Sequence, residues 1–134
     1  MPQRPAALAA ALLVAAVALA AAPPSLSAQP PIIGLITKTQ TNPFFVKMRE
    51  GAQSAARAAG ARLLTGAGKH DGDNAGQVTA MENMIAAGAQ VVLITVNDAK
   101  AIIPAIRRAR AQGIVVIALD SPTDPMTATD AFFG

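Results

Sequence analysis

Residues 91–96 read Val-Val-Leu-Ile-Thr-Val, residues 114–119 read Ile-Val-Val-Ile-Ala-Leu, and an amphipathic segment ending at Gly113 lies between them. Both runs consist almost entirely of β-branched and leucine side chains, without the polar alternation of a strand that has one face in water. Strands of this kind are typical of parallel sheets that are covered by helices on both faces. The stretch therefore predicts a β-α-β unit in an α/β fold.

The same pattern continues toward the N-terminus, where residues 32–36 and 62–65 are further strand candidates. Strand candidates recur at intervals of roughly 25 to 30 residues with amphipathic segments between them, which is the rhythm of successive βα units. At the other end, Ala131-Phe132-Phe133-Gly134 has the composition of the beginning of a fifth strand. A lobe that stopped there would leave a sheet edge unprotected, so we expect the chain to be truncated.

Start signals mark the predicted helices between these strands. The first helix has Asn42 as its N-cap and Pro43 as its first residue. The second opens near Asn74, whose side chain is expected to form a capping box with Gln77. The regular part of the third begins near Pro104, because proline is tolerated only in the first turn of a helix. Each of the three is expected to end at a glycine.

The first 28 residues have the pattern of a secretory signal peptide. A short segment with one arginine precedes an apolar run over residues 6–22, and a Pro-Pro break then leads into Ser25-Leu26-Ser27-Ala28. The alternative is a membrane anchor, but the run of about 17 residues is shorter than the about 20 that a membrane span needs. We therefore expect cleavage after Ala28, an exported mature chain of residues 29–134, and no membrane insertion after cleavage.

Composition narrows the classes of partner and of site. The chain has 11 Lys and Arg, 8 Asp and Glu, 1 His and no cysteine. Loss of the leader removes Arg4 and brings the charge closer to balance, so nothing favours nucleic acid or an anionic membrane as a partner. Without cysteine or a second histidine beside His70, we expect no transition-metal site.

Nucleotide-binding and catalytic motifs fail on inspection. Gly66-Ala67-Gly68 lacks the third glycine of a dinucleotide-binding loop, and His70 follows Lys69 where a phosphate loop needs serine or threonine. The sequence contains no Gly-x-Ser-x-Gly elbow. We therefore expect neither an enzyme nor a cofactor.

The first candidate binding residues follow the first predicted strand, because ligands of open parallel sheets bind outside the carboxyl ends of the strands. The polar loop there leads into Asn42-Pro43-Phe44-Phe45, which places an amide beside two of the chain's 4 phenylalanines. Amides pair with the hydroxyls of a sugar, and aromatic faces stack on its ring. The alternative is that Phe44 and Phe45 are core residues and that Asn42 only caps its helix.

A second candidate, Asp120, stands directly after the strand candidate at 114–119. A carboxylate in that place can accept two hydrogen bonds from neighbouring hydroxyls. The alternative is a turn-forming aspartate ahead of Ser121-Pro122, which is a common arrangement. Residue types alone leave both interpretations open.

These segments together resemble the ribose-type periplasmic binding proteins. The resemblance covers residues 31–134 and rests on the order and spacing of several pieces, which are Ile33-Gly34-Leu35-Ile36, Asn42-Pro43-Phe44-Phe45, Gly51-Ala52, Ala86-Ala87-Gly88-Ala89, Ile94-Thr95, Asn97-Asp98 and the run from Gly113 to Asp120. Residues 69–74 and 120–125 are most similar to the fructose-binding members of the family.

The resemblance implies two lobes of flavodoxin-like topology, joined by a hinge, that close over one monosaccharide. Residues 29–134 would be the incomplete N-terminal lobe, since no second lobe is present in this sequence. Such a protein is the substrate-binding component of a sugar ABC importer, and it presents its ligand to the permease in the periplasm. The alternative within the same family is a periplasmic sugar sensor that feeds a chemoreceptor or sensor kinase.

The resemblance also assigns roles to individual residues. Asn42 would hydrogen-bond the sugar, Phe44 and Phe45 would pack against it, Asp120 would bind hydroxyls, and Lys38 would face the cleft. Ribose binders usually carry an arginine directly after that aspartate, where this chain has a serine. Fructose-like and ribose-like sugars therefore both remain open.

Two other classes of protein share this kind of core. A transcription regulator of the lac-repressor type would begin with a helix-turn-helix, whereas this chain begins with a leader. An enzyme of flavodoxin-like topology would need a phosphate-binding first loop or a catalytic constellation, and neither is present in the sequence. We therefore expect a binding protein.

Overall fold

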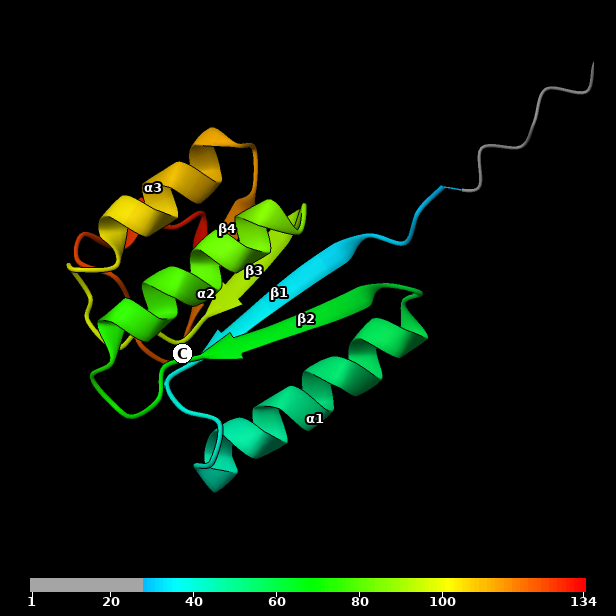
Figure 1. Ribbon diagram of the computed structural model, residues 1–134, viewed down its shortest axis with the longest axis horizontal. Coiled ribbons are helices and arrows are strands. Elements are labelled where there is room, and N and C mark those ends of the chain that lie inside the picture. Colours follow the sequence, from blue (N-terminus) through cyan, green and yellow to red (C-terminus); the bar gives the residue numbers. More distant parts are fainter. Residues whose placement is uncertain (1–27) are drawn as a thin grey trace, which may run out of the picture.

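The computed structural model describes residues 28–134, so the predicted signal peptide, apart from its last residue, lies outside the described residues. Its centre is a 5-stranded sheet in the order β2-β1-β3-β4-β5 with every pairing parallel (Figure 1). The strands are β1 (Ile32–Thr37), β2 (Arg62–Ala67), β3 (Val91–Ile94), β4 (Val115–Leu119) and β5 (Ala131–Phe133). The α/β class and the parallel sheet are confirmed, and the fifth strand candidate does pair with β4.

The connections are α1 (Pro43–Ala58), α2 (Asn74–Ala86) and α3 (Ile103–Ala111), with a short 3-10 helix η1 (Met126–Ala128) before β5. The step from β1 to β2 runs in the opposite direction along the sheet to the steps that follow. Right-handed connections therefore place α1 on one face and α2 and α3 on the other (Figure 1). The direction of winding changes between β1 and β3, which makes their carboxyl ends the switch point of the sheet.

All three predicted helix starts are confirmed, but the capping predicted for the second helix is wrong. Asn42 caps α1, because its side-chain oxygen accepts from the N–H of Phe44 at 3.0 Å. Pro104 lies in the first turn of α3, as proline requires. The N-cap of α2, however, is Asp73, whose carboxylate accepts from the N–H of Gly76 at 2.9 Å. The expected capping box of Asn74 with Gln77 does not form, because Gln77 is fully buried and bonds elsewhere.

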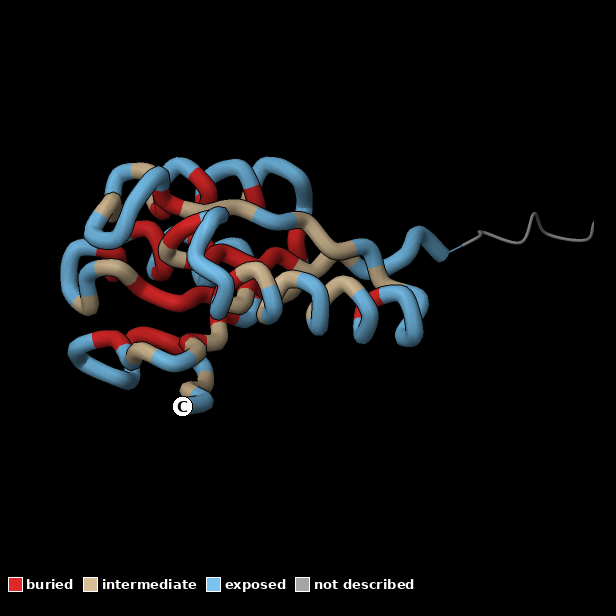
Figure 2. Tube along the Cα trace, turned by 90° about the horizontal axis from the view of Figure 1, so that it is seen from below, coloured by how far each residue is buried: buried red, intermediate tan, exposed pale blue. Residues whose placement is uncertain are grey.

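The main core lies between the sheet and the pair α2 and α3. Its members are apolar side chains from strands and helices alike, among them Ile36, Met81, Met84, Val92, Ile94, Ile102, Ile106 and Val116. The tube coloured by burial shows the buried residues as separate stretches that gather in the interior of the molecule (Figure 2). The α2 helix packs closely on the strands because Gly66 leaves room for it: a Cβ there would lie 2.8 Å from the Cβ of Ala80.

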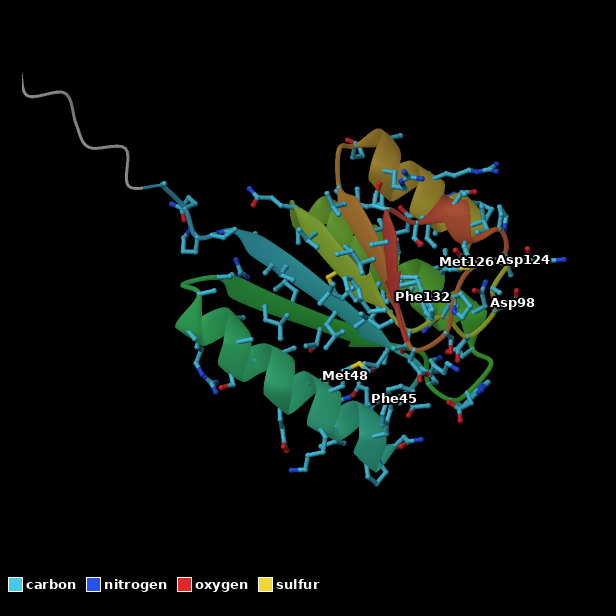
Figure 3. The ribbon with its side chains drawn as sticks, turned by 180° about the vertical axis from the view of Figure 1, so that it is seen from behind. Phe45, Met48, Asp98, Asp124, Met126 and Phe132 are labelled. Carbon is cyan, nitrogen blue, oxygen red and sulfur yellow. The ribbon has the colours of Figure 1, made fainter. Side chains whose placement is uncertain are left out.

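The opposite face of the sheet is only partly covered. The α1 helix packs on β1 and β2, while β3, β4 and β5 have no helix over this face within residues 28–134 (Figure 3). Because strand side chains alternate between faces, this face presents Leu93, Ile117 and Leu119 half-buried, with Val115 and Phe133 exposed at 42% and 65%. Within the described part of the chain, no helix has both the length and the apolar character that crossing a membrane requires.

Candidate functional site

All the loops that were expected to carry ligand residues emerge at one edge of the molecule, because every strand pairing is parallel. The loop after β1 leads into α1, the loop after β3 leads into α3, and the segment after β4 begins at Asp120. In doubly wound sheets the crevice at the switch point is the place where ligands bind. The predicted residues from these loops therefore lie along the edge that this fold uses for binding.

Asn42 caps α1 with its side-chain oxygen and has an amide Nδ2 group available to a ligand. Its Oδ1 accepts from the N–H of Phe44, and its own N–H donates to the Oγ1 of Thr39 at 3.3 Å. The residue is exposed, and no hydrogen bond within residues 28–134 uses its Nδ2 group. The cap therefore orients an amide whose donors are free to meet a hydroxyl oxygen.

The structure separates the two adjacent phenylalanines. Phe44 is 54% exposed and Phe45 is 4% exposed, and the rings meet edge to face with centroids 5.2 Å apart. Adjacent helical residues point about 100° apart, which accounts for the different environments. Phe45 thus fits the alternative of a core residue in this lobe, whereas Phe44 offers a ring to a ligand. Phe45 also supports that ring from the side.

Asp120 has an unusual backbone conformation. Its φ of 61° lies in the left-handed region, which non-glycine residues adopt rarely. Its N–H donates to the carbonyl of Phe133 at 2.8 Å, and its Oδ2 accepts from the hydroxyl of Ser121 at 3.3 Å. Strained backbone of this kind clusters at functional sites, where the surrounding structure maintains it. The arrangement presents an exposed carboxylate at the carboxyl end of β4.

The candidates from the first loop and Asp120 lie on the same edge but not on neighbouring strands. In the sheet order, β3 stands between β1 and β4, so the ends of those two strands are about 10 Å apart. Lys38, which follows β1 directly, is half-buried at this edge. The structure thus brings Lys38, Asn42, Phe44 and Asp120 to one side of the molecule, around the loop that follows β3.

Sequence reasoning missed a buried amide in the same region. The Nε2 group of Gln77 donates to the carbonyls of Thr37 at 3.2 Å and Thr95 at 2.7 Å, and its Oε1 accepts from the N–H of Asn97 at 2.8 Å. A signal was available, since Gln77 precedes Ala80, Met81 and Met84 on the apolar stripe of α2. A polar residue on such a stripe needs buried hydrogen-bond partners.

Backbone N–H groups stabilise the ionised form of two carboxylates at this edge. Those of Lys69 and Gly76 keep the pKa of the Asp73 carboxyl below its ordinary value. Those of Ala101 and Lys100 lower the pKa of Asp98 in the same way. Both carboxyls are therefore ionised at neutral pH, and they accept backbone hydrogen bonds within the loops after β2 and β3.

The segment after β4 is tied to the loop after β3. The N–H of Asp124 donates to the carbonyl of Ala99 at 3.0 Å, and the Asp124 carboxylate pairs with Lys100 at 3.2 Å. The ion pair is exposed and weak in water, so the backbone bond is the firmer link. Figure 3 shows Asp98 and Asp124 side by side at this end of the molecule.

A hollow of about 640 Å³ lies elsewhere, between β2 and α2. Its lining includes Gln40, Thr65, Lys69, His70, Thr79 and Asn83, and none of the five predicted ligand residues. It opens beside an edge strand rather than at the switch point, so the fold argument does not favour it as the main site. Within residues 28–134, no cluster of acidic and histidine side chains could hold a metal ion.

Comparison with known proteins places these observations in a family. Residues 33–134 match the family described as periplasmic binding protein domain. The D-ribose/D-allose-binding protein of Pseudomonas aeruginosa is 33% identical over 97 residues, which are 71% of this chain and 30% of that protein. The ribose import binding protein of Escherichia coli is 32% identical over 112 residues, which are 82% of this chain and 36% of that protein.

Solved structures give the same result. An ABC transporter periplasmic solute binding protein from Actinobacillus succinogenes with bound D-allose matches at 30% identity and a TM-score of 0.67, over 77% of this chain and 37% of the other. A solute binding protein from Clostridium phytofermentas with bound L-rhamnose matches at 30% identity and a TM-score of 0.70, over 77% and 32%.

The chain therefore spans about a third of the length of these relatives. Its matched region corresponds to a doubly wound parallel sheet with a switch point between β1 and β3. The family match extends over nearly all of the described residues. The chain belongs to the periplasmic binding protein family.

Proposed function

We propose that this chain is the sugar-binding N-terminal lobe of the substrate-binding component of an ABC importer, and that it works in the periplasm after cleavage of residues 1–28. The observation that carries the proposal is the exposed carboxylate of Asp120, maintained in a strained conformation at the binding edge of the sheet. Relatives that bind ribose or allose and a structure with bound D-allose support a monosaccharide as the ligand.

The chemistry of the edge fits a sugar. The Asp120 carboxylate accepts hydrogen bonds from two neighbouring hydroxyls, and the free Nδ2 of Asn42 donates to a ring or hydroxyl oxygen. The exposed ring of Phe44 stacks against the C–H face of the sugar. Lys38 adds a donor at the same edge. The lobe supplies no catalytic group to this arrangement, so the proposed role is binding and delivery to the permease.

One lobe alone is expected to bind weakly. A single wall leaves the sugar open to water, whereas small-molecule sites normally bury most of their ligand. We expect a dissociation constant in the millimolar range or weaker, which corresponds to about −4 kcal/mol. Micromolar binding of a monosaccharide by residues 29–134 in calorimetry would refute this expectation.

The test is an NMR titration of ¹⁵N-labelled residues 29–134 with D-ribose, D-allose, D-fructose and L-rhamnose. The amide chemical shifts are the readout. At least one sugar should shift the amides of residues 38–45 and 120–122 in a saturable way. Asp120→Asn should abolish this response, because a neutral amide loses the charge-assisted bonds to hydroxyls. Glu50→Gln, which changes an exposed carboxylate on α1, is the matched control and should respond like the wild type.

Two results would contradict the proposal. One is a saturable response confined to the hollow between β2 and α2, which would move the binding site to the edge strand. The other is a response at the predicted loops that Asp120→Asn leaves unchanged, which would remove the carboxylate from the site.

A further inference from the structure

We propose that Gln77 is a positioning residue that holds the loops after β1, β2 and β3 in register with one another, and thereby sets the geometry of the binding edge. The inference rests on the proposed function for its biological meaning, but the structural claim stands on contacts within this lobe. Gln77 comes from α2, has 0% of its surface exposed, and lies beneath all of these loops.

The first link joins the two strands at the switch point. The last β1–β3 pair is Ile36 with Ile94, and the N–H of Thr95 still bonds to Ile36 at 2.9 Å. Beyond this point the backbones diverge, and the ladder has no further rung between them. The Nε2 group of Gln77 donates to both carbonyls that follow, those of Thr37 and Thr95. One side chain thus continues the ladder by a rung where the sheet itself has ended.

The second link reaches the loop after β2 through Asn97. Oε1 of Gln77 accepts from the N–H of Asn97, and the Asn97 side chain then bonds in two directions. Its Oδ1 accepts from the N–H of Gly72 at 3.1 Å, and its Nδ2 donates to the carbonyl of Asp73 at 3.3 Å. The loop after β2 is therefore fixed by a residue that Gln77 itself orients.

The three loops come into direct contact at Gly68. A Cβ on this residue would lie 2.9 Å from the carbonyl of Lys38, 2.9 Å from that of Asp73 and 3.0 Å from Nδ2 of Asn97. These atoms belong to the loops after β1, β2 and β3 respectively. Because the loops are in such close contact, one loop cannot shift against another without a clash. The hydrogen bonds of Gln77 and Asn97 therefore set the spacing of the loops.

The effect extends to the segment that carries Asp120. The loop held by Thr95 and Asn97 continues to Ala99, whose carbonyl accepts from the N–H of Asp124. Gln77 is thus connected to Lys38 through Thr37 on one side, and to the segment after β4 through Ala99 on the other. The residues after β1 and those after β4, which form this lobe's wall of the proposed sugar site, thus depend on the same buried amide.

The experiment is hydrogen exchange of backbone amides in residues 29–134, with Gln77→Met as the test variant. Methionine fills a similar volume but makes no hydrogen bonds with the three backbone partners. The amide of Asn97 loses its acceptor directly, so the informative amides are Gly72 and Asp124, which do not touch Gln77. We expect these two to exchange about tenfold faster relative to the strand amide of Val92.

Met81→Ala is the matched control, because Met81 is also 0% exposed on α2 but belongs to the apolar core cluster. It should lower global stability and accelerate all protected amides together, without the selective effect on Gly72 and Asp124. If Gln77→Met does not fold, Asn97→Ala provides the second test. Because Gly72 then loses its acceptor directly, the informative amide is that of Asp73, which bonds to His70 within the loop after β2. It should exchange faster, while Asp124 stays near the wild-type rate.

The proposal is overturned if Gln77→Met accelerates Gly72 and Asp124 no more than Val92, or if Met81→Ala reproduces the selective pattern. Neither readout requires a sugar. A wild-type lobe that fails to respond to any sugar would therefore count against the proposed function alone. If the wild type does respond, Gln77→Met should weaken the sugar response by about tenfold, while Met81→Ala preserves it under conditions where it is folded.

Discussion

At the scale of single residues, the binding edge is built from side chains that also serve the fold. Asn42 caps α1 with one end of its amide and leaves the other end free. Asp120 takes a left-handed conformation in order to turn the chain after β4. Substitution of such a residue can change both the stability of the lobe and its binding of ligand. A suitable choice of the new side chain separates the two effects.

Asp120→Gly should stabilise the lobe while removing its ligand carboxylate. Glycine adopts a φ of 61° without the steric cost that a side chain imposes. We expect the free energy of unfolding in urea to rise by about 0.5–1 kcal/mol, together with loss of the sugar-dependent shifts. Asp124→Gly, on the same segment but outside the left-handed region, should not stabilise. Equal effects of the two substitutions would mean that the backbone at Asp120 is not strained.

At the scale of elements, glycines decide how closely α2 approaches the sheet. Gly66→Ala should lower the free energy of unfolding by about 1–3 kcal/mol, because the new Cβ would lie 2.8 Å from the Cβ of Ala80. Gly51→Ala is the matched control on α1, where nothing lies within 4 Å of the new Cβ. It should raise stability by about 0.5–1 kcal/mol. Urea unfolding of both variants measures the difference, and a neutral Gly66→Ala would show that α2 can move away.

Strand and helix positions were largely predictable because they depend on local patterns. Continuous apolar runs marked β1, β3 and β4, and proline with a preceding asparagine marked the start of α1. Errors arose where a tertiary partner outweighed the local signal. Thr95 and Val96 are both β-branched and continue the strand pattern, yet β3 ends at Ile94, and the Thr95 carbonyl bonds to the side chain of Gln77. The Asn74–Gln77 capping box failed for the same reason, since buried carbonyls claimed the glutamine.

The candidate site was predictable only in outline. The rule that ligands bind at the carboxyl ends of parallel strands located the edge, and residue chemistry selected Asn42 and Asp120. The sequence does not indicate which of the two adjacent phenylalanines, Phe44 or Phe45, is buried, because their burial depends on the direction in which α1 packs. The link from Gln77 through Asn97 joins residues from separate loops, so no local pattern reveals it.

At the scale of the whole molecule, acid should weaken the lobe through a small set of carboxylates. The N–H of Val116 and the guanidinium of Arg110 lower the pKa of Asp130, and backbone N–H groups lower the pKa of Asp73 and Asp98. A carboxyl whose pKa is lower in the folded state stabilises it above the unfolded value of about 3.9. That contribution disappears as the pH falls through the folded-state pKa.

Thermal unfolding of residues 29–134 should therefore change little from about pH 7 to about pH 5, and the melting temperature should fall steeply below about pH 4. The triple variant Asp73→Asn, Asp98→Asn and Asp130→Asn should melt lower than the wild type at neutral pH and show a shallower decline in acid. An unchanged slope in the triple variant would show that other groups govern acid unfolding.

The interior position of β1, between β2 and β3, also has a consequence for the time at which the lobe can fold. Among residues 28–134, β1 is the first strand that the ribosome completes, but its two neighbours begin only at Arg62 and at Val91. A nascent chain that ends before β3 holds an interior strand with one bare edge, and such distant parallel pairings form slowly. In a chain that crosses the membrane before it folds, this delay keeps β1 unpaired and able to pass through a translocation channel. The same sheet order that places the binding crevice beside β1 thus postpones folding until most of the lobe has been made.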